Sequence, residues 1–255
     1  NTVSHELRSP LANMEMAIQM LELIWFAAGR DLHNPHLPPT TSLSIADVQK
    51  GWRYFRMLQD ECQRETSLVN DLLDLSRLEA GTEPLIPTTI DLYAWIPHIV
   101  EPFLQRTQTQ QQQLEVQLAP CLPPLTTDLS SLERVLTELL HNACKYTPAT
   151  QQIIVSATAT AEFLYLQISN SGIEIPEAEL PHIFDKFYRI PSHDPWKHGG
   201  TGLGLALVKK RIEHLDATIQ AQSDDNWVHF TIAFPLADSS PQPKESRQTR
   251  KPANE

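Results

Sequence analysis

The most informative polar residues lie on one stripe of an amphipathic segment. Glu138, Asn142 and Lys145 follow one another at spacings of four and three residues, which in a helix places all three side chains on one face. A carboxylate, a carboxamide and an ammonium group together suit a metal-bound polyphosphate. Mg²⁺ prefers hard oxygen ligands such as the side-chain oxygen of Asn142, and Lys145 can neutralise phosphate charge during phosphoryl transfer. An ordinary solvated helix face explains the stripe about equally well, so this chemistry needs support from elsewhere in the chain.

A glycine-rich turn at residues 199–205, which reads GGTGLGL, is the second candidate. Glycines allow backbone N–H groups to approach phosphate oxygens, and the helix expected over 206–215 adds partial positive charge behind them. Such a turn is weak evidence alone, but this concentration of glycines favours a phosphate cradle over a merely flexible turn. The candidate residues of the turn are Gly200, Thr201, Gly202, Leu203, Gly204 and Leu205.

A histidine near the start of the chain could act as a nucleophile. His5 lies two positions before the apolar Leu7, about 200° around a helix, so its imidazole should point away from the apolar seam into solvent. A neutral imidazole near its pKa of about 6.5 can attack, and the adjacent Glu6 can accept the released proton. Pro10 removes a backbone hydrogen bond and loosens or bends the helix there. A lone surface histidine is more often without a role, so this interpretation also depends on the other elements.

Residues 1–81 have the pattern of two long helices. The apolar seam of the first helix recurs at spacings of four and three, through Leu7, Leu11, Met14, Ile18, Leu21 and Trp25. A loop containing proline and asparagine follows over 30–44, and a second helix runs from about 46 until Gly81 closes it. One hairpin cannot bury both of its seams, so the sequence predicts a homodimer in which two hairpins form a four-helix bundle.

The rest of the chain alternates helices with strands. Residues 82–90 are the expected linker, 91–237 a mixed α/β sandwich domain, and 238–255, rich in Pro, Ser, Gln and charge, a disordered tail. We expect helices over 91–110, 131–146 and 206–215. We expect strands over 114–118, 153–159, 163–169, 217–222 and 227–234.

Composition excludes several kinds of partner. A formal net charge of -11 disfavours nucleic-acid binding. Cys62, Cys121 and Cys144 have neither paired nor metal-like spacing, which favours the reducing cytoplasm. No apolar run approaches the roughly 20 residues that cross a bilayer, so we expect no membrane contact by this fragment. The first residues read as the middle of a helix, so any membrane anchor or sensor would precede Asn1.

Together, and in this order, these elements resemble the sensor histidine kinase family of two-component systems over residues 1–236. The segment SHELRSPL (4–11) looks like the family's phosphoacceptor motif, ELLHNACKYTP (138–148) like its asparagine box and IFDKFYR (183–189) like its phenylalanine box. The turn at 200–204 looks like its second glycine box. The implied fold is an α-helical hairpin that forms a dimeric four-helix bundle, followed by the α/β sandwich ATP-binding domain shared with gyrase- and chaperone-type ATPases.

The resemblance also implies an activity. Mg-ATP would phosphorylate His5, with Glu6 as acid/base, and the phosphoryl group would pass to an aspartate in the receiver domain of a response regulator. Glu138 would accept a proton or orient phosphate, Asn142 would hold Mg²⁺, and Arg189 would reach the γ-phosphate. The implied nucleotide contacts outside the glycine turn are Asn142, Lys145, Tyr146, Asn170, Gly172, Lys186 and Arg189.

Four positions depart from the family pattern, and the first is Glu138, which stands where many members carry asparagine. Asn170 stands where the family usually has the aspartate that reads adenine; its amide oxygen can still accept a hydrogen bond, but without charge, so ATP affinity should fall. Glu174 replaces a glycine and does not easily adopt φ > 0, so the local turn should differ. Ser9 lies where family members often use Thr or Asn to dephosphorylate the partner, which makes phosphatase activity a weaker expectation.

Two other classes of protein remain open. The changed adenine motif suits a dimeric scaffold with a degenerate ATP site. Glu138 suits an ATP-hydrolysing machine of the gyrase or chaperone type, which would explain neither His5 nor the helical hairpin.

Overall fold

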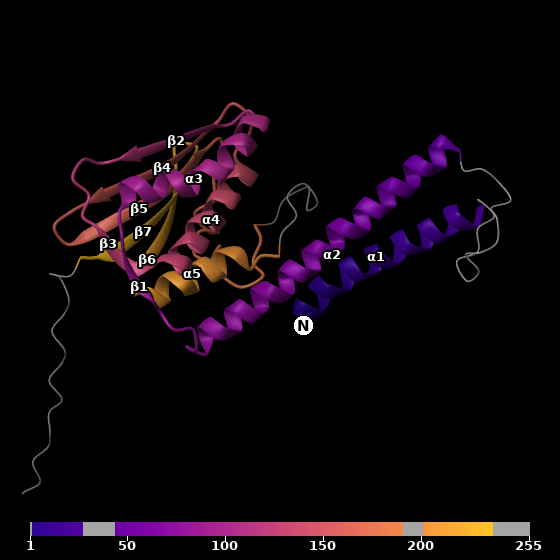
Figure 1. Cartoon of the computed structure of the whole chain (residues 1–255), viewed down its shortest axis with the longest axis horizontal. Helices are drawn as coiled ribbons and strands as arrows, with labels where there is room; N and C mark the ends of the chain where they lie inside the picture. Colours follow the sequence, from indigo (N-terminus) through magenta and orange to yellow (C-terminus); the bar gives the residue numbers. More distant parts are fainter. Residues whose placement is uncertain (1, 28–43, 191–200, 237–255) are drawn as a thin grey trace, which may run out of the picture. The chain divides into compact units, whose positions relative to one another are not determined.

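The computed structural model describes residues 2–27, 44–190 and 201–236 (Figure 1). They sort into two compact units. The helical unit comprises Asn1–Pro84 and Glu177–Arg211, and the sheet unit comprises Leu85–Pro176 and Ile212–Glu255. The chain passes between them within helix α5 (Gly204–His214), so the units alternate along the sequence.

Two long helices form a hairpin in the helical unit. Helix α1 spans Thr2–Ala27 and α2 spans Ile45–Glu79, and Figure 1 shows them lying side by side. Ser44 caps α2, because its hydroxyl oxygen accepts a hydrogen bond from the backbone N–H of Asp47 at 3.2 Å. Gly81, with φ 61°, follows the end of α2. The predicted hairpin is therefore confirmed.

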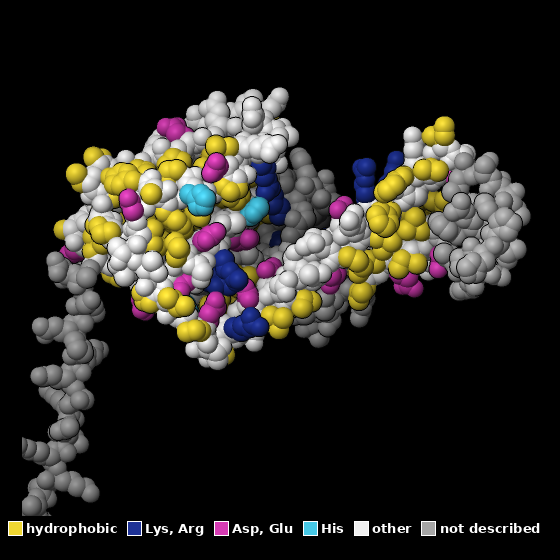
Figure 2. All heavy atoms as spheres, viewed as in Figure 1, with side chains coloured by type: hydrophobic (Ala, Val, Ile, Leu, Met, Phe, Trp, Pro, Cys, Tyr) yellow, Lys and Arg dark blue, Asp and Glu magenta, His cyan; other side chains and the backbone are white. Residues whose placement is uncertain are grey.

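The hairpin buries only part of its apolar seam. Leu11 and Ile18, both seam residues of α1, are 57% and 47% exposed. On α2, Trp52 is 59% exposed and Val69 49%. Figure 2 shows hydrophobic side chains gathered on the surface of this hairpin. An apolar surface of this kind is typical of an interaction face.

The sheet unit contains a five-stranded mixed sheet with the strand order β2-β4-β5-β7-β6. Strands β2 and β4 are parallel, and the other neighbours are antiparallel. The strands are β2 (Gln113–Leu118), β4 (Gln152–Ala159), β5 (Phe163–Ser171), β6 (Thr218–Asp224) and β7 (Trp227–Pro235). Helices α3 (Leu92–Thr109) and α4 (Leu129–Tyr146) complete the α/β arrangement. Each element lies close to its predicted position, so the predicted α/β architecture is confirmed.

Two short strands were not expected from the sequence. Strand β1 (Pro87–Ile90) lies within the segment interpreted as linker and pairs antiparallel with β3 (Leu125–Asp128). Each has only four residues, and β1 is exposed except at Ile90, so neither shows a readable alternation of apolar and polar residues.

The core of the sheet unit lies between α4 and the sheet. α4 buries one side, and β5 buries alternate residues along its first part. The fully buried side chains include Leu132, Leu136, Leu139, Leu140, Ile153, Leu164, Ile168 and Ile232. Among the described residues, no helix has the length and apolar character needed to cross a bilayer.

Candidate functional site

The predicted polar stripe is present on α4. Glu138, Asn142 and Lys145 are all half-buried, at the border of the helix's buried side. The Nζ atom of Lys145 lies 4.9 Å from the ring centroid of Tyr146, which is 40% exposed. The carboxylate, carboxamide and ammonium groups therefore share one accessible face at the C-terminal half of α4.

Asp128 fixes the start of that helix. Its carboxylate accepts hydrogen bonds from the backbone N–H of Ser131 at 2.8 Å and of Ile86 at 2.9 Å, and from the hydroxyl of Ser130 at 2.8 Å. Burial alone would raise the pKa of Asp128, but these donors outweigh it and lower the pKa to about 2. The charged cap therefore holds α4 in place, and it ties the helix to the residue just before β1.

Asn170 lies near the end of β5 and is almost fully enclosed. It is 2% exposed and continues the row of buried residues formed by Leu164, Leu166 and Ile168. Its side-chain Nδ2 has no hydrogen-bond partner among the described residues. A buried amide donor without a partner is unusual in a folded protein and points to a group that the described residues do not supply.

Gly172 follows Asn170 at a position that needs glycine. Its φ is 83°, and a Cβ there would lie 2.6 Å from Cγ of Gln151 and 2.9 Å from Cδ of Pro148. Glu174 has no positive φ, and its carboxylate accepts a hydrogen bond from the backbone N–H of Asn226 at 3.0 Å. The chain therefore places Glu174 here without the positive φ that a glycine allows, and a turn that differs from the family pattern stays a prediction.

In the helical unit, the glycine turn packs against the predicted phenylalanine box. Gly202 has φ 70°, and a Cβ there would lie 2.8 Å from the carbonyl carbon of Phe187. The backbone N–H of Phe187 donates to the carbonyl oxygen of Gly202 at 2.9 Å. Thr201 is hydrogen-bonded to the carboxylate of Asp71, whose pKa is raised by burial and by the nearby Asp74. Helix α5 begins at Gly204, two residues before the predicted start at 206.

Residues 177–211 also contact α2 within the helical unit. Leu203 and Leu207 form a buried cluster with Leu68, Leu75 and Leu78 of α2. This cluster therefore buries part of the apolar side of α2.

Charged contacts surround that cluster. The guanidinium of Arg211, whose side chain is 5% exposed, lies 2.8 Å from the carboxylate of Asp74 and 3.5 Å from that of Glu83. The Nζ atom of Lys186 lies 2.5 Å from the carboxylate of Glu79, and its predicted contact with nucleotide stays a prediction. Arg189 is exposed just before the undescribed segment 191–200.

Some predicted residues lie outside what the structure describes. His5, Glu6 and Ser9 belong to α1, but their side chains are not among the described ones, so the orientation of the imidazole stays a prediction. Gly200 falls in the undescribed segment 191–200.

The described site residues therefore form two groups. The sheet unit contains Glu138, Asn142, Lys145, Tyr146, Asn170 and Gly172. The helical unit contains Lys186, Arg189, Thr201, Gly202, Leu203, Gly204 and Leu205.

Sequence reasoning missed Asp128 and Arg211. Asp128 directly precedes an amphipathic run, and this N-cap signal could have been found. The role of Arg211 could not be predicted from the sequence, because its partners Asp74 and Glu83 lie 137 and 128 residues away.

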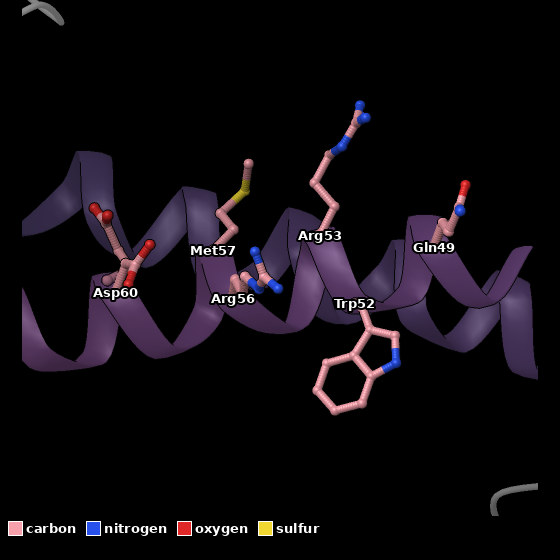
Figure 3. Close-up of a pocket in the computed structure, with 7 residues that line it drawn as sticks. Gln49, Trp52, Arg53, Arg56, Met57 and Asp60 are labelled. Carbon is pink, nitrogen blue, oxygen red and sulfur yellow. The ribbon is translucent and has the colours of Figure 1, made fainter. Parts of the chain in front are cut away.

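A hollow of about 860 Å³ lies along α2 in the helical unit. Figure 3 shows its labelled side chains on successive turns of α2, with Trp52 and Arg53 on opposite sides of the ribbon. The lining residues are Gln49, Trp52, Arg53, Arg56, Met57, Asp60 and Glu61. None belongs to the predicted nucleotide site, so this hollow is a separate feature of the hairpin surface.

Comparison with known families gives two matches. Residues 1–81 match the His Kinase A (phospho-acceptor) domain. Residues 127–238 match the histidine kinase-, DNA gyrase B- and HSP90-like ATPase family. The chain belongs to the sensor histidine kinase family.

Individual relatives agree. The sensor histidine kinase WalK of Bacillus subtilis is 30% identical over 238 residues, which cover 91% of this chain and 36% of WalK. The sensor protein VanS of Enterococcus faecium is 27% identical, with 92% of this chain and 62% of VanS covered. The chain thus spans less than two thirds of either sensor kinase.

Solved structures show the same fold. The Acinetobacter baumannii histidine kinase AdeS is similar with a TM-score of 0.65 and 24% identity, over 91% of this chain and 98% of that one. The histidine kinase ThkA, solved in complex with the response regulator protein TrrA, gives a TM-score of 0.67 and 21% identity, over 92% and 60% of the two chains. A helical region followed by an α/β domain of the ATPase type is therefore the fold of this chain.

Proposed function

We propose that this chain is the catalytic core of a sensor histidine kinase, which uses Mg-ATP to phosphorylate His5 and passes the phosphoryl group to an aspartate of a response regulator. One observation carries the proposal: a phospho-acceptor domain over 1–81 and an ATPase domain over 127–238 occur in the same chain. Phosphoryl transfer requires both a nucleophile and a nucleotide site, and neither domain provides both.

The nucleotide is held by residues of distinct chemistry. The buried amide of Asn170 reads the base, and the backbone of residues 200–205 with the start of α5 approaches the phosphates. Lys145 and Arg189 neutralise phosphate charge, Tyr146 lies near the nucleotide, and Lys186 reaches it after leaving Glu79. The accessible α4 stripe, and the Nδ2 of Asn170 that no described residue pairs with, support the part of this proposal that lies in the sheet unit.

The donor set on α4 fits a magnesium ion. The side-chain oxygen of Asn142 is a hard ligand of the kind that Mg²⁺ prefers, and Glu138 lies one turn earlier on the same face. When bound, the ion neutralises charge on the phosphate oxygens.

The transfer step exchanges one bond for another. The unprotonated ring nitrogen of His5 forms a bond to the γ-phosphorus while the bond from that phosphorus to the β–γ bridging oxygen breaks, and ADP leaves. The proton on the other ring nitrogen passes to Glu6. In-line attack requires the ATP domain to move on the part of the predicted linker that precedes Ile86 and β1 until the γ-phosphate faces His5.

The hairpin surface supports a homodimer. Seam residues Leu11 and Ile18 remain about half exposed in a single chain, and a second hairpin would cover them in a four-helix bundle. The phosphorylated histidine would then serve a receiver domain, as the complex of the related ThkA with TrrA suggests. All three cysteines are free thiols, as is usual in a reducing compartment. We therefore place the chain in the cytoplasm.

Incubation with γ-³²P-labelled ATP and Mg²⁺ tests the proposal. We expect acid-labile, alkali-stable label on the wild-type protein and none on His5→Gln. The matched control is His98→Gln, an exposed histidine on α3 outside the site, which should label like the wild type.

Three results would contradict the kinase proposal. Label that persists on His5→Gln would remove His5 as the acceptor. Stable dimers without label would favour the scaffold that the Asn170 departure suggests, and rapid phosphate release without protein label would favour a hydrolase.

A further inference from the structure

The amide of Asn170 can serve two opposite hydrogen-bonding roles. It carries a carbonyl acceptor and an NH₂ donor at nearly the same place, and it has no charge. At 2% exposure it cannot use water freely, and its Nδ2 is unpaired among the described residues. The missing partner is therefore an acceptor, which a bound base can provide.

Adenine and guanine present complementary edges to such an amide. Adenine offers its N6 amino group as donor beside N1 as acceptor, and guanine offers O6 as acceptor beside N1–H as donor. An amide can pair with either edge through two hydrogen bonds, because rotation of its terminal group exchanges the positions of the carbonyl oxygen and the NH₂ group. A carboxylate could accept from adenine but would face the O6 of guanine with a second acceptor.

The polar neighbours of Asn170 do not fix the orientation of its amide. The hydroxyl of Ser171 donates to the side-chain oxygen of Gln151 at 2.9 Å and accepts from the backbone N–H of Gln152 at 2.9 Å. The hydroxyl of Ser169 is paired with Nδ1 of His229 at 2.8 Å. The preceding residues in the buried row are aliphatic, so they offer the amide no competing hydrogen bond.

On the basis of the proposed nucleotide site, we propose that Asn170 makes this kinase accept guanine as well as adenine nucleotides. The neutral amide removes the repulsion that a carboxylate would exert on the O6 of guanine. The cost is the loss of a charge-assisted bond to the amino group of adenine, so ATP and GTP become similar in affinity.

Calorimetric titration of the whole chain with ATP and with GTP, each with Mg²⁺, tests this. We expect the two dissociation constants of the wild type to lie within about tenfold of each other. Asn170→Asp should raise the ratio in favour of ATP by at least about tenfold, mainly through weaker GTP binding. The matched control is Asn70→Asp, the same change at an exposed position of α2, which should leave the ratio unchanged.

The outcomes separate this inference from the function on which it rests. If the wild type binds ATP but binds GTP more than about tenfold more weakly, the inference is overturned and the kinase proposal stands. If neither nucleotide binds, both fail.

A second ligand covers the case in which Asn170→Asp does not fold, which a thermal melt would show. Inosine triphosphate has the O6 and N1–H edge of guanine without the 2-amino group. Binding by the wild type within about tenfold of ATP supports the inference, and weaker binding overturns it.

Discussion

The charged cap of α4 predicts a large and pH-dependent effect of a small substitution. Asp128→Asn keeps the size of the side chain but removes its charge and turns an NH₂ group toward one of its backbone N–H donors. The pKa of Asp128 falls from 3.8 to about 2 in the folded protein. A depression of this size corresponds to about 2 kcal/mol of folding free energy at pH 7. We therefore expect Asp128→Asn to destabilise the sheet unit by about 2 kcal/mol.

The sign of the pH dependence follows from the direction of the shift. Because the folded pKa lies below the unfolded value, the contribution is complete above about pH 4 and is lost as the pH falls toward 2. The difference between wild type and Asp128→Asn should fall to roughly half near pH 3, where the unfolded chain already binds the proton.

Urea unfolding at pH 7, 5 and 3, with hydrogen exchange of the α4 amides as a local probe, measures both effects. The matched control is Asp91→Asn at the exposed N-cap of α3. The Asp91 carboxylate accepts a hydrogen bond of 3.0 Å from the backbone N–H of Tyr93 in its own helix, whereas the Asp128 carboxylate also accepts one from another segment. We expect it to cost about 1 kcal/mol or less. A cost below about 0.5 kcal/mol for Asp128→Asn, or one that stays constant from pH 5 to pH 3, would refute the reasoning.

Two further substitutions test the helical unit, both by urea unfolding. Gly202→Ala should lower the free energy of unfolding by several kcal/mol more than Gly81→Ala does. Both glycines have positive φ, so both substitutions strain the backbone. Only at Gly202 would the new Cβ also lie within 3.0 Å of other backbone atoms, because a Cβ at Gly81 has nothing within 4 Å. Equal costs would show that the close packing of the glycine turn is unimportant. Arg211→Ala should destabilise the helical unit by about 1 to 3 kcal/mol, since it removes the ion pair with the half-buried carboxylate of Asp74, while Arg211→Lys should recover part of the loss. An unchanged midpoint for Arg211→Ala would contradict the ion pair.

Local pattern was enough to predict most elements of the fold. Helical periodicity located α1, α2 and α4, and period-two alternation located β4, β5 and β7, because these elements are long and bury one consistent side. The short strands β1 and β3 were not predicted, because four residues of mixed exposure are too few to show an alternation of apolar and polar side chains. The α4 stripe and the glycine turn were also readable, because each is set by spacing within a single segment.

The chain's sequence by itself determined which chemical groups are present: an imidazole on a helix, an acid, an amide and an amine on one helix face, and a glycine turn. Tertiary structure decided their surroundings. It enclosed Asn170 so that no described residue pairs with its Nδ2, bound Asp128 to Ile86 from another segment, and paired Arg211 with Asp74 from far along the chain. Burial and long-range contacts depend on how the whole chain packs, and they set the charge state and pairing of each group. Sequence spacing cannot supply that information.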